Sequence, residues 1–107
     1  MSRILLRGRA YAATLSNIGV EKYFVVVSNN QRNRALDSVL AVRVTTSAKP
    51  ALPSIVELGP ADPLVGRVVC DDIVELYADE VSRELGALSP RTMDRLGDGL
   101  RAALALP

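Results

Sequence analysis

The sequence has no histidine, no tryptophan and only one cysteine among its 107 residues. Without histidine, the chain cannot build a Ser-His-Asp triad, a Cys-His nucleophile pair or a histidine-containing zinc site. A single cysteine can form neither an intrachain disulfide nor a Cys-x-x-Cys motif, so nothing indicates a disulfide-stabilised secreted scaffold. These absences exclude much of the standard hydrolase and metal chemistry.

Long apolar segments are also missing. The longest strongly apolar run, Tyr23 to Val27, is far shorter than a membrane-spanning helix requires. At the N-terminus, Arg3 and Arg7 leave too little room between them for the apolar region of a signal peptide. We therefore expect a cytoplasmic protein with no membrane partner, folded as one domain over residues 1–107.

The charge is divided unevenly between the two halves of the chain. The net charge of the whole chain is only +1. Residues 1–50 hold eight basic and two acidic residues, a net charge of +6, whereas residues 51–107 hold five arginines and ten acidic residues, a net charge of −5. The basic half suggests an anionic partner, with nucleic acid as the leading candidate. Alternatively, the two halves interleave their charges on one folded surface.

Most of the chain has the pattern of short strands separated by turns. Runs rich in β-branched and aromatic residues alternate with segments rich in Gly, Pro, Asn and Ser. The strands are expected over residues 9–15, 22–28, 39–46, 54–58 and 67–76.

The C-terminal part of the chain changes to a helical period. Ser89 is a good N-cap, and Pro90 occupies the first helical position, where its missing N–H has no cost. Apolar residues then recur at spacings of three and four, which predicts a buried helix face consisting of Met93, Leu96, Leu100, Ala103 and Leu104. A shorter helix is expected over residues 78–85. Together these patterns predict a mainly β chain with a C-terminal helix, an SH3-like or OB-like small barrel of about residues 5–76 followed by a helical part of about 78–106.

The third expected strand holds polar residues suited to binding an anion. Because side chains alternate across a strand, Arg43 and Thr45 share one side with Ala41. A cation and a hydroxyl are thereby held two residues apart on one surface. Without a further signal, Arg43 can equally be a solvated charge and Thr45 an ordinary strand residue.

A polar segment follows the second expected strand. Residues 28–34 are expected to form a loop with two arginines among amides, a composition that can contact phosphates and base edges of single-stranded RNA. The same composition also suits a simple solvated loop. Cys70 lies in an apolar run and is expected to be a small core residue rather than a nucleophile.

The order and spacing of several blocks resemble the MazF/PemK toxin family. The resemblance covers roughly residues 5–106 and is most specific in the block after the second strand and in the C-terminal helix. The blocks are Arg7-Gly8, YFVVVSNNQRNR, AVRVTTS, GRVVCDDI and LGALSPRTMDRLGDGLRAALAL.

The resemblance implies the fold, activity and partners of this family. Its members are homodimeric SH3-like barrels that act as ribosome-independent endoribonucleases and are neutralised by a cognate antitoxin. The ribose 2′-OH attacks the neighbouring phosphate, leaving a 2′,3′-cyclic phosphate and a 5′-OH, and no metal or other cofactor is needed. Because the substrate supplies the nucleophile, a chain without histidine suffices. The expected substrate is single-stranded or loop RNA, either messenger or transfer RNA.

The resemblance also assigns site residues by position. The catalytic Thr of the family falls on Thr45, and the position of its usual strand-two Arg is occupied by Lys22, which lacks the bidentate guanidinium. The acid of a strand-five Arg-x-Asp motif falls on Asp71, and Arg43 is the candidate to replace the missing guanidinium. The residues expected to bind RNA are Asn29, Asn30, Arg32, Asn33, Arg34, Thr46, Ser47 and Lys49.

Two other readings belong to different functional classes. The same fold includes toxins that bind DNA gyrase and cut nothing. A catalytically degenerate member that only binds RNA is also compatible with the absent arginine.

Overall fold

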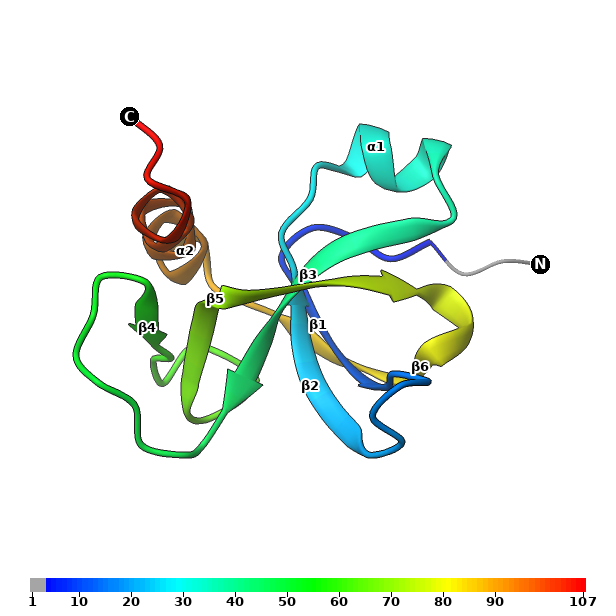
Figure 1. Cartoon of the computed structure of the whole chain (residues 1–107), viewed down its shortest axis with the longest axis horizontal. Coiled ribbons are helices and arrows are strands. Elements are labelled where there is room, and N and C mark those ends of the chain that lie inside the picture. The colour runs from blue at the N-terminus through cyan, green and yellow to red at the C-terminus, as the bar shows by residue number, and fades with distance from the viewer. Residues whose placement is uncertain (1–3) are drawn as a thin grey trace.

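Six strands form one antiparallel sheet, and a helix packs on one of its faces (Figure 1). The computed structural model describes residues 4–107, so Arg3 of the basic half lies outside the described residues. Along the chain the elements are β1 Arg9–Thr14, β2 Glu21–Val26, α1 Asn30–Ala35, β3 Ser38–Thr45, β4 Ile55–Glu57, β5 Arg67–Tyr77, the 3-10 helix η1 Ala78–Glu80, β6 Val81–Ala87 and α2 Pro90–Leu104. The prediction of a mainly β chain with a C-terminal helix is confirmed.

The sheet has the strand order β4-β5-β3-β2-β1-β6, which places β3 near its centre. Pairing between β3 and β5 is interrupted where Val42 opposite Ile73 is followed by Arg43 opposite Val69. The additional β5 residues at this irregularity bend the strand, as bulges do, and Figure 1 shows β5 turning sharply between its two ends. The bend lets one long strand pair along the whole of β3 and also carry β4.

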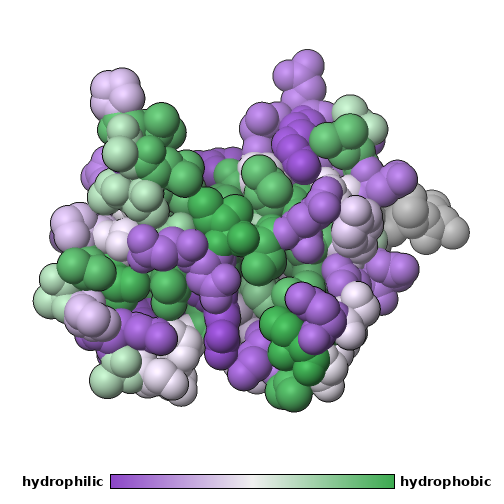
Figure 2. All heavy atoms as spheres, viewed as in Figure 1, coloured by the Kyte–Doolittle hydropathy of each residue, from purple (hydrophilic) through white to green (hydrophobic). Residues whose placement is uncertain are grey.

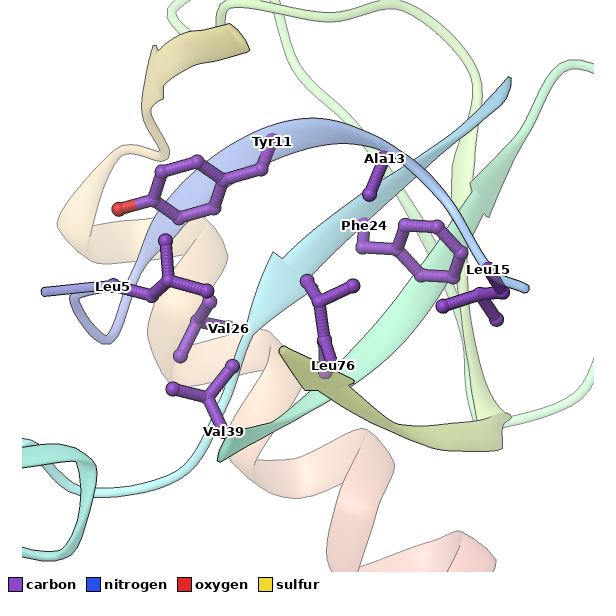
Figure 3. Packing of buried hydrophobic residues seen from close by; sticks show 9 residues of the cluster. Leu5, Tyr11, Ala13, Leu15, Phe24, Val26, Val39 and Leu76 are labelled. Carbon is purple, nitrogen blue, oxygen red and sulfur yellow. The ribbon is translucent and has the colours of Figure 1, made fainter. Parts of the chain in front are cut away.

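The alternation of side chains along the strands divides the core into two clusters, one on each face of the sheet. Tyr11, Phe24 and Val26 lie in the first cluster, which Figure 3 shows from close by. Val25 and Val42, from the opposite face of the same strands, lie in the second cluster. Ala41 belongs to the first cluster and Val44 to the second, as the alternation along the third expected strand requires.

Helix α2 covers the second cluster. Its Leu96 is fully buried, and Met93, Leu100 and Ala103 pack beside it as partly buried neighbours. Leu104 was expected on the same face but is 52% exposed, because the helix ends there and extends past the sheet. None of the helices in the described part of the chain is long and apolar enough to cross a membrane.

The start of α2 is tied to the turn that precedes β5. The Ser89 hydroxyl accepts a hydrogen bond from the Thr92 amide at 3.2 Å, as expected of an N-cap. Asp62 accepts from the Ser89 amide at 2.8 Å, from the Thr92 hydroxyl at 2.7 Å and from the Gly59 amide at 2.7 Å. One carboxylate therefore joins residues 59–62 to the first turn of the helix.

Two expectations about secondary structure are wrong. The segment 29–34 was expected to be a loop but forms α1, because Asn29 caps the Arg32 amide at 2.8 Å and the buried Asn33 hydrogen-bonds to the Ser28 carbonyl and hydroxyl. The segment 78–85 was expected to be helical but forms η1 and most of β6. The open edge of β1 supplies backbone partners to β6, and this tertiary pairing overrides the local preference.

Gly97 and Gly99 both lie inside α2, and they offer a matched test of the helix packing. A Cβ at Gly99 would lie 2.8 Å from the Cys70 sulfur and 3.1 Å from Val56, whereas the nearest atom to a Cβ at Gly97 is an Arg101 nitrogen at 3.9 Å. We predict that overpacking in Gly99→Ala lowers the free energy of unfolding by about 1–3 kcal/mol. The higher helix propensity of alanine offsets about 1 kcal/mol of this loss. Gly97→Ala should gain up to about 1 kcal/mol. Urea unfolding measures both changes, and equal stability of the two variants would contradict this packing.

Asp62 is predicted to make the stability of the fold depend on acid pH. Burial opposes its ionisation, but the hydrogen bonds from Ser89, Gly59 and Thr92 outweigh this and hold its pKa below the ordinary value of 3.8. A lowered folded-state pKa adds stability above 3.8 that is lost as the pH falls through the folded-state value. Asp62→Ala should therefore cost about 1–2 kcal/mol at neutral pH, and this cost should shrink in acid.

The control for this variant is Asp94→Ala, which removes an exposed carboxylate of α2. Its unfolding free energy should stay within about 0.5 kcal/mol of the wild type at every pH. A cost for Asp62→Ala that stays constant from neutral pH to strong acid would contradict the role assigned to the ionised carboxylate.

Candidate functional site

A cavity of about 600 Å³ opens where β2 begins and β3 ends. Three parts of the chain contribute to its wall: the start of β2, the end of β3 with the residues after it, and the turn before β5. The lining residues are Glu21, Lys22, Tyr23, Arg43, Val44, Thr45, Thr46, Ser47, Pro63, Leu64 and Val65.

Two cations line this cavity and have no acidic partner among the described residues. Lys22 lies at the start of β2, and Arg43 lies on β3 opposite Phe24. Neither side chain takes part in an ion pair within residues 4–107. The Arg43 Nε is buried and has no hydrogen-bond partner within that range. A buried donor without a partner is costly, so the cavity is suited to receive an anion.

Thr45 presents a fixed hydroxyl beside these cations. The Ser47 amide donates a hydrogen bond to Thr45 Oγ1 at 3.1 Å, a local turn that sets the direction of the hydroxyl. Because the oxygen is the acceptor in this bond, the hydroxyl hydrogen is left to donate to a bound group. Thr46 and Ser47, which were predicted to bind RNA, line the same cavity.

Gly66 packs directly against the backbone at the end of β3. Gly66 has a φ of +115°, and a Cβ there would lie 2.4 Å from the Thr45 carbonyl oxygen. The position therefore excludes a side chain on both steric and conformational grounds. This close approach lets the turn before β5 form one wall of the cavity.

The residues of α1 are not part of this cavity. The helix follows the end of β2 and precedes β3, so it lies at the other end of both strands (Figure 1). A six-residue strand such as β2 spans roughly 17 Å. The Asn29 side chain caps the helix, and the Arg32 guanidinium donates to the Ser38 carbonyl at 2.8 Å. The predicted RNA-binding residues Asn29, Asn30, Arg32, Asn33 and Arg34 thus form a separate basic group.

Two further predicted residues also lie outside the cavity lining. Lys49 lines a second hollow of about 530 Å³, formed by residues 48–53 with parts of β4 and β5. Asp71 is exposed on β5 and accepts a hydrogen bond from the Ser54 hydroxyl at 2.7 Å. The structure therefore brings together Lys22, Arg43 and Thr45 of the four predicted catalytic residues.

Several residues around the cavity were not predicted from the sequence. Leu64 and Val65 lie between the strands expected over 54–58 and 67–76, in a segment to which no role was assigned, although both are apolar and Val65 is 80% exposed. Arg83 of β6 stands 6.0 Å from the centre of the Tyr23 ring and pairs with Glu21 at 3.5 Å. Its place on a strand beside β1 was hidden by the helical expectation for residues 78–85. The two adjacent apolar residues in this Gly- and Pro-rich segment were the one local signal in the sequence.

The arrangement is suited to binding and polarising a phosphate group. Two cations and a hydroxyl donor converge on one open cavity, and charge-assisted hydrogen bonds to an anion are stronger than neutral ones. Groups of this type can also stabilise negative charge that develops on a phosphorus centre. Among residues 4–107 no cluster of three or more Cys, Asp or Glu side chains could hold a metal ion.

The sequence matches the family described as PemK-like, MazF-like toxin of type II toxin-antitoxin systems over residues 7–104. The chain belongs to this family, and the predicted resemblance is confirmed.

Curated relatives and solved structures agree with this membership. The chain is 43% identical over 102 residues to Endoribonuclease MazF4 of Mycobacterium tuberculosis and to Endoribonuclease MazF1 of Mycobacterium bovis, covering 95% of this chain and 94% of each relative. It superposes on an endoribonuclease from a mycobacterial species with a TM-score of 0.90 at 40% identity, covering 100% of this chain and 97% of the other. A second mycobacterial endoribonuclease, solved in complex with its cognate antitoxin, gives a TM-score of 0.89 at 42% identity, covering 96% and 97%.

Cys70 is predicted to be chemically inert in the folded protein. Its side chain is fully buried beneath α2, and burial, together with the neighbouring Asp71 carboxylate, raises the pKa of the thiol to about 11. Iodoacetamide at pH 8 should leave the native protein unmodified for hours and should alkylate it quickly in concentrated urea. Mass spectrometry measures both reactions, and equal rates in the two conditions would contradict the buried position.

Proposed function

We propose that this chain is a toxin endoribonuclease that cleaves single-stranded or loop RNA in messenger or transfer RNA. The observation that carries the proposal is that Lys22 and Arg43, two cations without an acidic partner within residues 4–107, line the same cavity as the Thr45 hydroxyl. Such a cavity is suited to hold the phosphate group that links two nucleotides of an RNA strand. The mycobacterial relatives named as endoribonucleases share the fold at about 40% identity, which supports the same reaction here.

The cleavage reaction uses a nucleophile from the substrate. The ribose 2′ oxygen forms a bond to the adjacent phosphorus while the bond from phosphorus to the 5′ oxygen breaks, so a 2′,3′-cyclic phosphate and a 5′-OH result. The 2′-OH gives its proton to solvent water, and the leaving 5′ oxygen gains one from the protein. The chain therefore has to position the phosphate, neutralise its added charge and supply a proton.

We assign a separate role to each side chain of the cavity. Arg43 binds a non-bridging phosphate oxygen with the guanidinium that the lysine at position 22 does not provide. Thr45 donates its hydroxyl hydrogen to another phosphate oxygen. Lys22 is the amine of the cavity and gives the proton to the 5′ oxygen. Asp71 has no part in these steps, because it lies outside the cavity lining and is hydrogen-bonded to Ser54.

The same proposal includes two protein partners and a location. Figure 2 shows apolar side chains gathered across the middle of the viewed face, with hydrophilic side chains around them. A contiguous apolar area of this kind is suited to a second copy of the chain and to an antitoxin segment. We propose a homodimer that is neutralised by a cognate antitoxin, as a mycobacterial relative was solved with its own. We also propose a cytoplasmic location, because messenger and transfer RNA are found there.

The roles of Thr45 and Lys22 are tested by their alanine variants. We predict that Thr45→Ala and Lys22→Ala each lose at least tenfold in kcat/KM, which corresponds to about 1.4 kcal/mol of transition-state stabilisation. Thr45→Ala removes a contact to the phosphate, and Lys22→Ala removes the proton donor. Asp71→Asn is the matched control and should keep at least half of the activity. Single-turnover cleavage of a labelled RNA measures all three, after circular dichroism has established that each variant is folded.

The products identify the reaction class. Incubation of the wild-type protein with total RNA should create new 5′-OH ends next to 2′,3′-cyclic phosphates, and the cleavage should persist in EDTA. No new ends under these conditions, together with inhibition of DNA gyrase, would favour the gyrase-binding class. No new ends together with measurable RNA binding would indicate a degenerate member. Full activity of both alanine variants would overturn the assignment of these residues.

A further inference from the structure

Arg67 lies directly opposite Thr45 in the pairing of β3 with β5, just after Gly66. Its guanidinium makes two bonds to the Glu57 carboxylate of β4, from Nε at 2.7 Å and from Nη2 at 3.1 Å. Its Nη1 donates to the Thr46 carbonyl at 3.1 Å and to the Ser47 carbonyl at 2.6 Å. One side chain thus joins β4 to the two residues that follow β3.

This connection continues to the Thr45 hydroxyl. The Ser47 carbonyl is held by Arg67, and the Ser47 amide donates to Thr45 Oγ1 at 3.1 Å. The two bonds fix both peptide groups of Ser47, and the local turn then sets the direction of the Thr45 hydroxyl. Without the guanidinium, the exposed residues after Thr45 would lose their attachment to the sheet, and the turn between the Ser47 amide and Thr45 would open more often.

The charge of Arg67 is already used within the protein. Its hydrogen bond holds the pKa of Glu57 below the ordinary value, and the carboxylate in turn raises the pKa of Arg67. The guanidinium donates to four acceptors, and the residue is absent from the cavity lining, although it lies next to Gly66 behind the Thr45 carbonyl. Arg67 is therefore placed to hold the wall of the cavity rather than to bind a phosphate.

We propose that Arg67, held by Glu57, is a positioning residue that fixes residues 45–47 so that the Thr45 hydroxyl points at the substrate phosphate. This inference rests on the proposed function for the role of Thr45. The hydrogen bonds from Arg67 to Glu57, Thr46 and Ser47, called the Arg67 brace below, are a property of the folded chain itself. Because Glu57 and the residues after β3 are exposed, loss of the guanidinium should alter geometry more than stability.

The kinetic test uses Arg67→Met, which keeps much of the apolar stem and removes the guanidinium. We expect kcat to fall at least tenfold while KM changes less than threefold, because binding of the RNA continues without correct alignment of the hydroxyl. Arg67→Lys should recover part of the loss, since one ammonium group cannot serve a carboxylate and two carbonyls in the same fork. Arg101→Met, which removes an exposed arginine paired with Asp98 on α2, is the matched control and should keep full activity.

A double-mutant cycle separates positioning of Thr45 from a general effect. In a Thr45→Ala background the added Arg67→Met change should lower kcat less than twofold, because the hydroxyl that Arg67 positions is already absent. A further tenfold loss in that background would overturn the proposal, since Arg67 would then act on another group. A rise in KM with unchanged kcat would also overturn it and would indicate a direct contact with RNA.

Amide hydrogen exchange tests the brace without any RNA. The Ser47 amide should exchange at least tenfold faster in Arg67→Met than in the wild type, while amides of the buried β2 and of α2 keep their rates. Arg101→Met should leave the Ser47 rate unchanged. An unchanged Ser47 rate in Arg67→Met would overturn the brace whatever the activity. Wild-type protein that cleaves no RNA but shows the faster Ser47 exchange in the variant would overturn the proposed function and leave the brace standing.

Discussion

The pairing of β3 with strands on both sides is the interaction on which the rest of the structure depends. Its residues alternate between the two core clusters, and β2 on one side and β5 on the other complete its backbone hydrogen bonds. The same register places Arg43 and Thr45, which flank the buried Val44 along the strand, in the lining of the cavity. A slip of one residue would turn Arg43 and Thr45 to the opposite face and replace them with apolar side chains. The core and the site are therefore specified by one alignment.

Two parts of the molecule use arginine in opposite ways. Arg67 is fully engaged by Glu57 and by backbone carbonyls, so its charge serves the local structure. Arg43 has a buried Nε without a partner in residues 4–107, so its charge remains available to a ligand. An uncompensated buried donor lowers stability, and such a cost is expected where a protein keeps a site ready for an anion. Proximity of a basic residue to the cavity is thus a poor guide to its role.

Much of this arrangement could be read from local patterns. The alternation along 41–45 predicted that Arg43 and Thr45 share a surface, and the Ser-Pro start predicted α2. The short α1 was missed because six residues contain too little helical period to distinguish from an Asn-rich turn. The brace at Arg67 was out of reach because it depends on the irregular register of β5 against β3, which no local pattern encodes. Long-range pairing decided the position of Arg67, whereas the local hydrogen bonds of Asn29 and Asn33 decided α1.

The contact between Gly99 and Cys70 has a consequence beyond packing. It sets how far α2 stands from the sheet, and the first turn of the same helix is bonded through Thr92 to Asp62. Asp62 immediately precedes the segment 63–65 that walls the cavity. Although α2 supplies no residue to the lining of the cavity, it is thereby connected through Asp62 to the segment that forms one wall of the cavity. A methyl group at position 99 would press on Cys70 and Val56, and the bond from Thr92 to Asp62 would carry that displacement toward the residues that wall the cavity.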